Sequence, residues 1–302
     1  MTPLLVSLLG LVQSELSRRG FASLPFVAAL PGFSRLSLGD RLALRDPSQL
    51  AKPLFSSYAS QTGYPAWLAG TWDVEQAFDG FVFPSKRITR AQIMNQPTVP
   101  GLQKLSVVSI PDMGKTPTRF QMRFSTPDGW AGRCFEDKAF NLASMVDGSL
   151  EARLVQKIEY SAAQNPNRLS VIFRPGKTRN AERVELFYNA REAEDVSEDL
   201  FVASEHLRQV TFSGSPDGAV RQVSTSYGQY QTFTRLRDGS GRVRLNLLTA
   251  AYLEPTEQEA LYFDAVDQPV IVYSHEAMLR AAPPPEVVPP SPSVSEVVVY
   301  PF

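Results

Sequence analysis

Residues 64–72 read YPAWLAGTW, and this stretch precedes a long region in which apolar residues mostly recur with period two. A Gly-x-Trp at the first strand of an all-β domain, here Gly70 and Trp72, is typical of a small closed barrel. Glycine lets one backbone segment approach another closely, and the indole fills the wide end of the barrel. The stretch therefore predicts a β-barrel architecture, but it does not indicate a reaction or a ligand.

Alternation of apolar and polar side chains continues after Trp72 and indicates half-buried strands. Phe120, Met122 and Phe124, for example, are separated by charged or amide residues. Later strands are expected near residues 168–174, 182–190, 200–213, 220–235, 242–253 and 269–277. Turn sequences separate these runs. Because about eight to ten antiparallel strands with short connections can close into one sheet, we expect a single lipocalin-like or fatty-acid-binding-like β-barrel.

The barrel is expected at residues 61–281, and two segments interrupt or follow it. Residues 84–118 contain scattered prolines and few alternating runs, so we expect a long loop over a barrel mouth. Residues 282–302 hold seven prolines and no Lys or Arg. Such a composition predicts an extended, disordered tail outside the domain.

Residues 1–60 differ from the rest and suggest a targeting or irregular segment. They hold six basic and three acidic residues, and residues 17–21 read SRRGF before the apolar run 24–30. This arrangement resembles a twin-arginine export signal, and the basic, serine-containing composition also suits a plastid transit peptide. The alternative is an amphipathic helix packed on the barrel.

Overall composition excludes several classes of protein. The 302 residues carry a formal net charge of −1, which gives no general attraction to nucleic acid. Cys134 is the only cysteine, so no intramolecular disulfide can form. The apolar run at residues 3–12 is far shorter than the roughly 20 residues that span a bilayer, so we expect no transmembrane segment.

Several local signatures occur together in a fixed order along the chain. They are the 64–72 stretch, Pro100-Gly101, Lys138-Ala139-Phe140-Asn141, Asn165-Pro166-Asn167-Arg168, Ser204-Glu205-x-x-Arg208-Gln209, Thr249-Ala250-x-Tyr252-Leu253 and Pro269-Val270-x-x-Tyr273. Over about residues 63–277 the chain resembles an uncharacterised domain-of-unknown-function family of cyanobacteria and plastids. The resemblance implies a photosynthetic organism, a chloroplast location, most simply the thylakoid lumen, and no established activity. The family usually has an acidic-basic pair before Ala-Phe-Asn, and this chain has Asp137-Lys138 there.

An apolar ligand inside the barrel is the first functional hypothesis, because closed antiparallel barrels of this size often hold one. The expected lining consists of Trp72, Phe78, Phe124, Tyr160 and Tyr227. Gly70-x-Trp72 is similar to the lipocalin opening motif, and the resemblance to lipocalins implies that Arg280 covers the indole. The alternative is a barrel filled by its own aromatic side chains.

The segment 235–244 reads RLRDGSGRVR and is a local concentration of positive charge. A short turn would bring Arg235 and Arg237 opposite Arg242 and Arg244, and like charges across strands repel. A lipid headgroup, a phosphate or an acidic protein face would relieve the repulsion. The alternative is a solvated tip with splayed arginines.

Catalytic and metal chemistry have weaker support. Ser204 and His206 lie two apart on one expected strand, but a hydrolase also needs an oriented base and an oxyanion hole, and no Gly-x-Ser-x-Gly occurs. With two histidines and one cysteine, no metal site is expected, and no glycine-rich phosphate loop indicates a nucleotide cofactor. A polar set, Asn141, Asn167, Arg168, Glu205 and Arg208, is expected to fix turns and buried networks, and the alternative is ligand contact.

The sequence thus predicts a non-enzymatic plastid protein, without cofactors, that binds a lipid, pigment or quinone. The alternative is an interaction module that docks on a thylakoid complex or membrane surface through the arginine hairpin, the 84–118 loop or the tail.

Overall fold

The computed structural model describes residues 36–53, 60–96, 98–99, 117–127, 129, 132–149, 152–178, 181–214 and 220–283. The twin-arginine-like residues, residues 100–116 of the expected loop and nearly all of the expected tail lie outside this part of the chain. The elements are α2 (Leu38–Ala43), η1 (Pro47–Leu50), β1 (Gly63–Pro65), η2 (Ala66–Leu68), β2 (Gly70–Val82), α3 (Arg90–Met94), β3 (Thr118–Ser125), β4 (Arg133–Glu136), α4 (Lys138–Ser149), β5 (Val155–Ser161), β6 (Asn165–Phe173), β7 (Arg183–Ser197), β8 (Leu200–Gly214), β9 (Val220–Arg235), β10 (Val243–Tyr252), α5 (Glu259–Ala265) and β11 (Ile271–Ala281).

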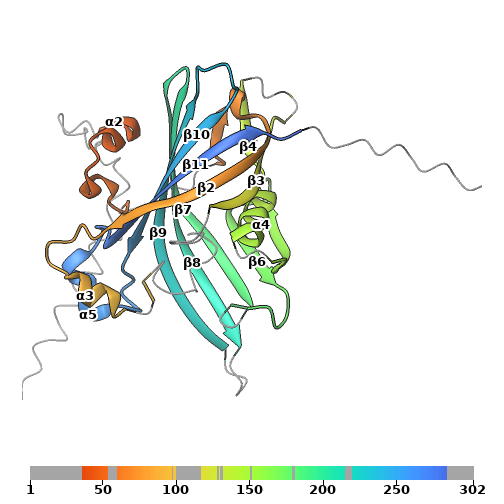
Figure 1. Ribbon diagram of the computed structural model, residues 1–302. Coiled ribbons are helices and arrows are strands. Elements are labelled where there is room, and N and C mark those ends of the chain that lie inside the picture. The colour runs from red at the N-terminus through yellow and green to blue at the C-terminus, as the bar shows by residue number, and fades with distance from the viewer. Residues whose placement is uncertain are drawn as a thin grey trace, which may run out of the picture. The chain divides into compact units, whose positions relative to one another are not determined.

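The strands form one curled antiparallel sheet in the order β1-β4-β3-β2-β11-β10-β9-β8-β7-β6-β5 (Figure 1). The predicted all-β, barrel-like fold is confirmed, with eleven strands in the described sheet rather than eight to ten. Strands β5 to β11 follow one another as a meander, and β11 then pairs with β2. Among the described residues β1 pairs only with β4 and β5 only with β6, so strand pairing does not close the ring.

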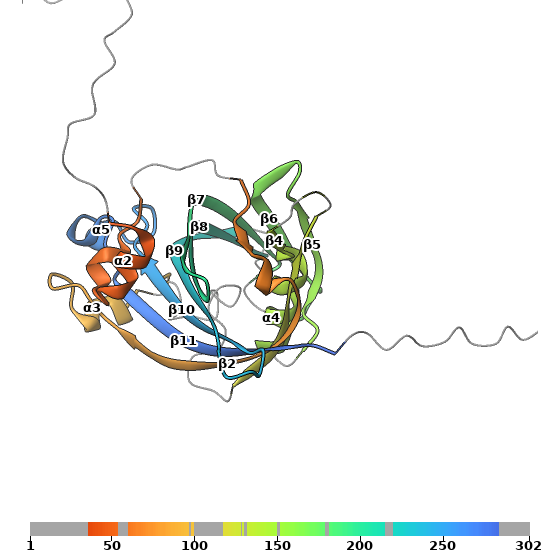
Figure 2. The same cartoon turned by 90° about the horizontal axis from the view of Figure 1, so that it is seen from above.

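Helix α4, which the sequence analysis did not predict, connects the two ends of this sheet. It follows β4 in the chain, leads into β5 and packs on both β3 and β5 (Figure 2). Its first turn begins after Asp137, whose side chain accepts a hydrogen bond from the Phe140 amide at 3.1 Å, as N-cap residues do. Gly148 permits close packing, because a Cβ there would lie 2.4 Å from the Arg119 carbonyl oxygen.

Polar side chains of α4 also take the place of a neighbouring strand along β3. Asn141 Oδ1 accepts from the Arg123 amide at 2.6 Å, and its Nδ2 donates to the Arg123 carbonyl at 3.3 Å. The Gln121 amide donates to Ser144 Oγ at 2.8 Å. An exposed strand edge promotes unwanted pairing with other chains, and here the helix covers it. The described ring is therefore completed by a helix instead of by a β ladder.

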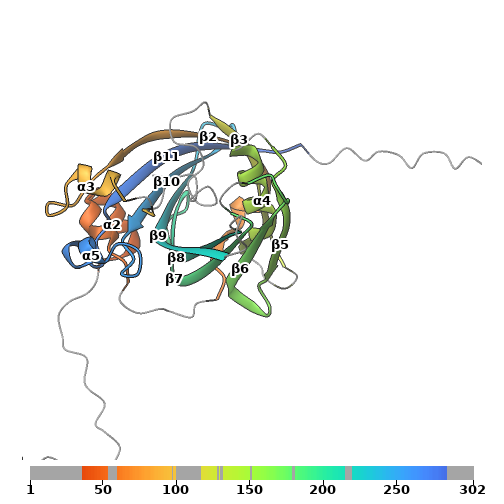
Figure 3. The same cartoon turned by 90° about the horizontal axis from the view of Figure 1, so that it is seen from below.

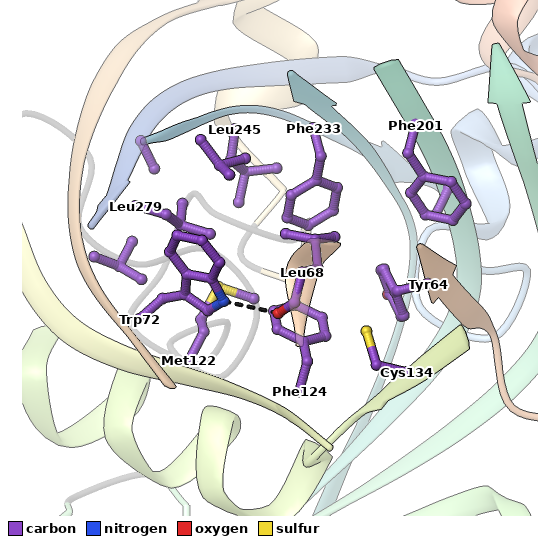
Figure 4. Packing of buried hydrophobic residues seen from close by; sticks show 14 residues of the cluster. Tyr64, Leu68, Trp72, Met122, Phe124, Cys134, Phe201, Phe233, Leu245 and Leu279 are labelled. Carbon is purple, nitrogen blue, oxygen red and sulfur yellow. Dashed lines mark hydrogen bonds between the residues drawn. The ribbon is translucent and has the colours of Figure 1, made fainter. Parts of the chain in front are cut away.

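The concave face of the sheet is filled by three apolar clusters. At one end, β1 and η2 run into the ring, and Tyr64 packs on Phe124, Phe201 and Phe233 (Figures 2 and 4). A second cluster lies between α4 and β5 to β9. A third cluster joins α3 and α5 to the other end of β2, β10 and β11 (Figure 3).

The convex face carries a fourth cluster beneath the segment 37–53. Leu38 and Leu50 pack there on Val202, Tyr252 and Val272. Two contacts hold one end of this segment on β7: Arg41 pairs with Glu192, and the Gly39 amide donates to Glu194 Oε2 at 2.9 Å. Residues 37–53 of the segment 1–60 thus pack on the sheet, and whether the segment acts in targeting stays a prediction. We call residues 37–53 the strap.

Candidate functional site

A buried network of four charged side chains lies in the middle of the ring. Lys138 Nζ, at the start of α4, is 2.8 Å from Glu205 Oε2 on β8 and 3.0 Å from Glu136 Oε2 on β4. Arg191 Nε on β7 is 2.9 Å from Glu205 Oε1. The side chains of Lys138, Arg191 and Glu205 are 6%, 3% and 8% exposed, so solvent screens these pairs little.

A β-bulge positions Arg191 for this role. The register of β7 against β8 shifts between Tyr188 and Ala190, and Arg191 then lies opposite Glu205. A bulge redirects the side chains that follow it, and here both Tyr188 and Arg191 point into the ring. Arg191 also donates to Asn167 Oδ1 and the Pro166 carbonyl, which connects β7 to the start of β6.

The network is held in its ionised form. Burial alone would raise the pKa of Glu205, but the charges of Lys138 and Arg191 and their hydrogen bonds keep that pKa below its usual value. Burial also opposes the Lys138 ammonium, yet Glu136 and Glu205 raise the pKa of Lys138 well above its usual value. A protonated lysine is no nucleophile, so this geometry favours a structural role over amine catalysis.

A cavity of about 80 Å³ adjoins the network. Its walls include Gln76, Gln229 and Gln231, and the Gln76 Nε2 atom is buried with no hydrogen-bond partner among the described residues. This volume is far below the range of about 300–1,000 Å³ of pockets that hold a small organic ligand. The interior is therefore polar at its centre and closed by aromatic side chains at one end.

The five aromatic residues expected to line a ligand cavity do not meet in one place. Trp72 and Phe124 belong to the cluster around Tyr64, and Trp72 Nε1 donates to the Leu68 carbonyl at 2.8 Å (Figure 4). Phe78 packs with the α3 and α5 cluster, Tyr160 is half-buried on β5, and Tyr227 borders the small cavity. Their binding role stays a prediction, and the interior arrangement matches the alternative of a filled barrel.

Arg280 does not cover the indole, contrary to the lipocalin analogy. It is exposed and borders a surface depression with Asp73 and Glu75, whereas its neighbour Leu279 is fully buried in the Trp72 cluster. Successive strand residues point to opposite faces, so Arg280 and Trp72 lie on different sides of the sheet.

The arginines of the β9–β10 hairpin are not directly opposite one another. Arg235 pairs with Val243, and Arg244 pairs with Thr234. Carboxylates of the same chain neutralise the group: Asp199 binds both Arg235 and Arg237, Asp238 binds Arg242, and Glu276 lies 3.4 Å from Arg244. The expected cross-strand repulsion is thus offset within the protein, and anion or partner binding at these four arginines stays a prediction.

Ser204 and His206 lie on the convex face but are buried beneath the strap. Their exposed fractions are 1% and 4%. His206 Nε2 shares a hydrogen bond with the Tyr230 hydroxyl at 3.2 Å, so this nitrogen is directed at a tyrosine. These two residues are buried because Leu50 of the strap clusters with Tyr230 and Tyr252 above this face. The packing of the strap on this face was not predicted from the sequence.

The structure divides the predicted polar set. Asn141, Asn167 and Glu205 join the interior network, with Asn141 Nδ2 donating to Glu136 Oε1 at 3.2 Å. Arg168 instead binds Glu185 at 3.0 Å, and exposed Arg208 lies over the Phe187 ring. Arg191 and Gln76 were not predicted as members of this interior site. Gln76 could have been found, because the period-two alternation through Trp72 and Val74 places it on the inner face of the strand. Arg191 could not, because no local sequence feature indicates the bulge that precedes it.

A long groove runs on the convex face between the strap and the sheet. Its volume is about 900 Å³, and its walls include Leu42, Leu50, Val202, Leu248 and Val272. Two further wall residues on β2, Phe81 and Val82, are 42% and 51% exposed. Val82 lies opposite Val272 on the outward face, whereas Phe81 lies opposite Tyr273 and contacts its ring. The strap that covers the outward face was not predicted.

Among the described residues, no helix has the length and apolar character needed to cross a membrane.

Comparison with known proteins gives a family and no activity. The family model described as Domain of unknown function (DUF6816) matches residues 58–282, which is most of the chain, and the protein belongs to that family. The match extends from just before β1 to just after β11 and so covers the sheet and its helices α3 to α5. No curated protein matches the sequence.

Proposed function

For this member of a family of unknown function, we propose a non-enzymatic role in which the chain binds a small lipophilic ligand in the convex groove. The groove volume of about 900 Å³ carries the proposal, because it lies within the range of about 300–1,000 Å³ of known ligand pockets. The interior cavity of about 80 Å³ is too small for a lipid, pigment or quinone.

The lining of the groove suits an amphipathic molecule. Leu248 and Val272 form an apolar floor between Leu50 of the strap and the half-exposed Val82 of β2. One cross-strand row places Thr232 beside Asn246, and both side chains border the groove. A few polar groups on an apolar surface fix the orientation of a bound molecule.

The strap is attached at both ends, so the groove has a fixed wall. Arg41 pairs with Glu192 at one end. At the other end the Tyr252 hydroxyl donates to the Leu50 carbonyl at 2.6 Å, and the Lys52 amide donates to the Asp267 carbonyl at 2.7 Å. A preformed wall lowers the ordering cost of binding.

Fluorescence titration of the full chain with cis-parinaric acid, a fluorescent fatty acid, tests the proposal. We expect saturable binding at one site and a loss of affinity of at least tenfold in Leu248→Trp, because Leu248 lines the groove and the larger indole takes up part of the ligand's space. Met278→Trp is the matched control, because Met278 is also partly exposed on the convex face but does not line the groove. Absence of saturable binding, or equal affinity of the two variants for the fatty acid, would exclude the groove as the ligand-binding site.

We also propose a chloroplast location, most simply the thylakoid lumen. The basic, serine-containing segment 1–60 with its Arg18-Arg19 pair supports it. Import of the radiolabelled full chain into isolated chloroplasts, followed by fractionation, tests it, and a protease-sensitive product outside the organelle would refute it.

A further inference from the structure

A second hollow lies on the convex face where β8, β9 and β10 run side by side. Arg208, Ser226 and Tyr252 form one cross-strand row, and His206, Gly228 and Ala250 form the next. Directly opposed residues in an antiparallel sheet have Cβ atoms about 4.5–5.5 Å apart. The register therefore places the side chains of Arg208, Ser226 and His206 around one point.

Gly228 leaves the floor of this hollow without a side chain. A Cβ at Gly228 would lie 2.9 Å from the Tyr252 hydroxyl and 3.0 Å from the His206 ring. Any larger residue would therefore displace one of these two walls. The resulting pocket has a volume of about 360 Å³.

Cationic and hydrogen-bonding groups surround the pocket from the strap and from strands β7, β8 and β9. Lys52 reaches it from the strap, with Nζ 3.4 Å from both Ser226 Oγ and Glu254 Oε1. Both distances are at the long limit of a hydrogen bond, so the ammonium is weakly engaged. Asn189, the extra residue of the β7 bulge, also borders the pocket.

The charges of the pocket favour an anion. Lys52 and Arg208 contribute two positive charges, and Glu254 contributes the one carboxylate on the wall. Arg208 has no ion-pair partner within the described ranges. A guanidinium binds phosphate oxygens in pairs, a lysine adds a point charge, and the Ser226 hydroxyl and Asn189 amide supply further donors.

We propose that this pocket, distinct from the groove, binds the phosphate group of a phosphate monoester. A phosphate group alone does not fill about 360 Å³, and the remaining volume accommodates the esterified part. The proposal does not depend on a lipophilic ligand in the groove. Two sources share the recognised chemistry: a water-soluble phosphate ester and a lipid headgroup.

Isothermal titration of the full chain at constant ionic strength tests the proposal. The probes are glycerol 3-phosphate and lysophosphatidate below its micellar concentration, with glycerol as the uncharged control. We expect one site for a phosphate compound and at least tenfold weaker binding in Arg208→Gln and in Lys52→Gln. The matched control is Arg221→Gln, an exposed arginine of β9 outside the pocket, and we expect its affinity to stay within twofold.

The two probes distinguish the sources. Binding of glycerol 3-phosphate that Arg208→Gln weakens assigns a soluble ester. Binding of lysophosphatidate alone, weakened by the same variant, assigns a lipid headgroup. Failure of both probes to bind, or wild-type affinity in Arg208→Gln and Lys52→Gln, would overturn the proposal. Thermal unfolding of each variant checks that the exposed substitutions leave the fold intact.

Discussion

Replacement of Glu205 by glutamine is expected to destabilise the protein strongly. The carboxylate bridges Lys138 at 2.8 Å and Arg191 at 2.9 Å, and it is 8% exposed. Glutamine keeps the size of the side chain but removes the charge. Lys138 then retains Glu136, whereas the hydrogen bonds from Arg191 to Asn167 and Pro166 go to neutral oxygens. Removing one partner of a buried ion pair typically costs about 3–5 kcal/mol, and we expect a loss in that range.

Urea unfolding followed by circular dichroism at pH 7 measures this loss. Glu159→Gln is the matched control, because Glu159 pairs with Lys157 at the surface and both are more than half exposed. Exposed pairs contribute about 0–1 kcal/mol. A Glu205→Gln cost below about 1 kcal/mol, or one no larger than that of the control, would show that the network is not a buried ionic unit.

The pH dependence has a defined sign. The pKa of Glu205 is lowered in the folded state, so its contribution is present above the unfolded value of about 4.3 and is lost as pH falls through the folded value. The pKa of Lys138 is raised, so its contribution is present below the unfolded value of about 10.4 and is lost as pH rises through the folded value. The stability difference between wild type and Glu205→Gln should therefore shrink in acid below about pH 4.3, and a constant difference would contradict the assignment.

Three further substitutions test the closure by α4 and the hairpin, each by thermal unfolding at pH 7. Asn141→Ala removes the oxygen that accepts from the Arg123 amide, whereas the Arg123 carbonyl keeps the Asp137 amide, and it should cost about 1–3 kcal/mol; an unchanged midpoint would mean that water replaces the side chain. Gly148→Ala places a methyl group 2.4 Å from the Arg119 carbonyl and should cost about 1–3 kcal/mol, and a more stable variant would refute the close approach. Arg237→Gln removes a 77% exposed partner and should change stability by less than about 1 kcal/mol; a larger loss would reveal a structural role for the hairpin.

Much of the barrel was predictable because period-two alternation is a local signal. The expected strands at 200–213 and 220–235 coincide closely with β8 and β9. Strand β7 continues to Ser197, beyond the expected end at 190. The extension was not predicted because residues 191–197 include three acidic residues and show no apolar alternation. These residues pair with β8 through backbone hydrogen bonds, and such pairing does not require alternating hydrophobic residues in the sequence.

The candidate sites were less predictable than the strands. Lys138 and Glu205 are 67 residues apart, and only the packing of α4 against the sheet brings the ammonium to the carboxylate. Arg191 enters the network through a bulge that no turn residue signals. The groove depends on a strap whose hydrogen bonds run to β7 and to the α5–β11 connection, far along the chain.

The amino-acid sequence by itself determined the strand content, the antiparallel meander and the membership of the family, because alternation and turn residues act over a few positions. The tertiary structure decided that a helix completes the ring, that charges occupy its centre, and that the groove and the second hollow lie on the convex face. These features depend on contacts between distant segments, whose geometry is set by packing and burial of the whole sheet and not by any local pattern.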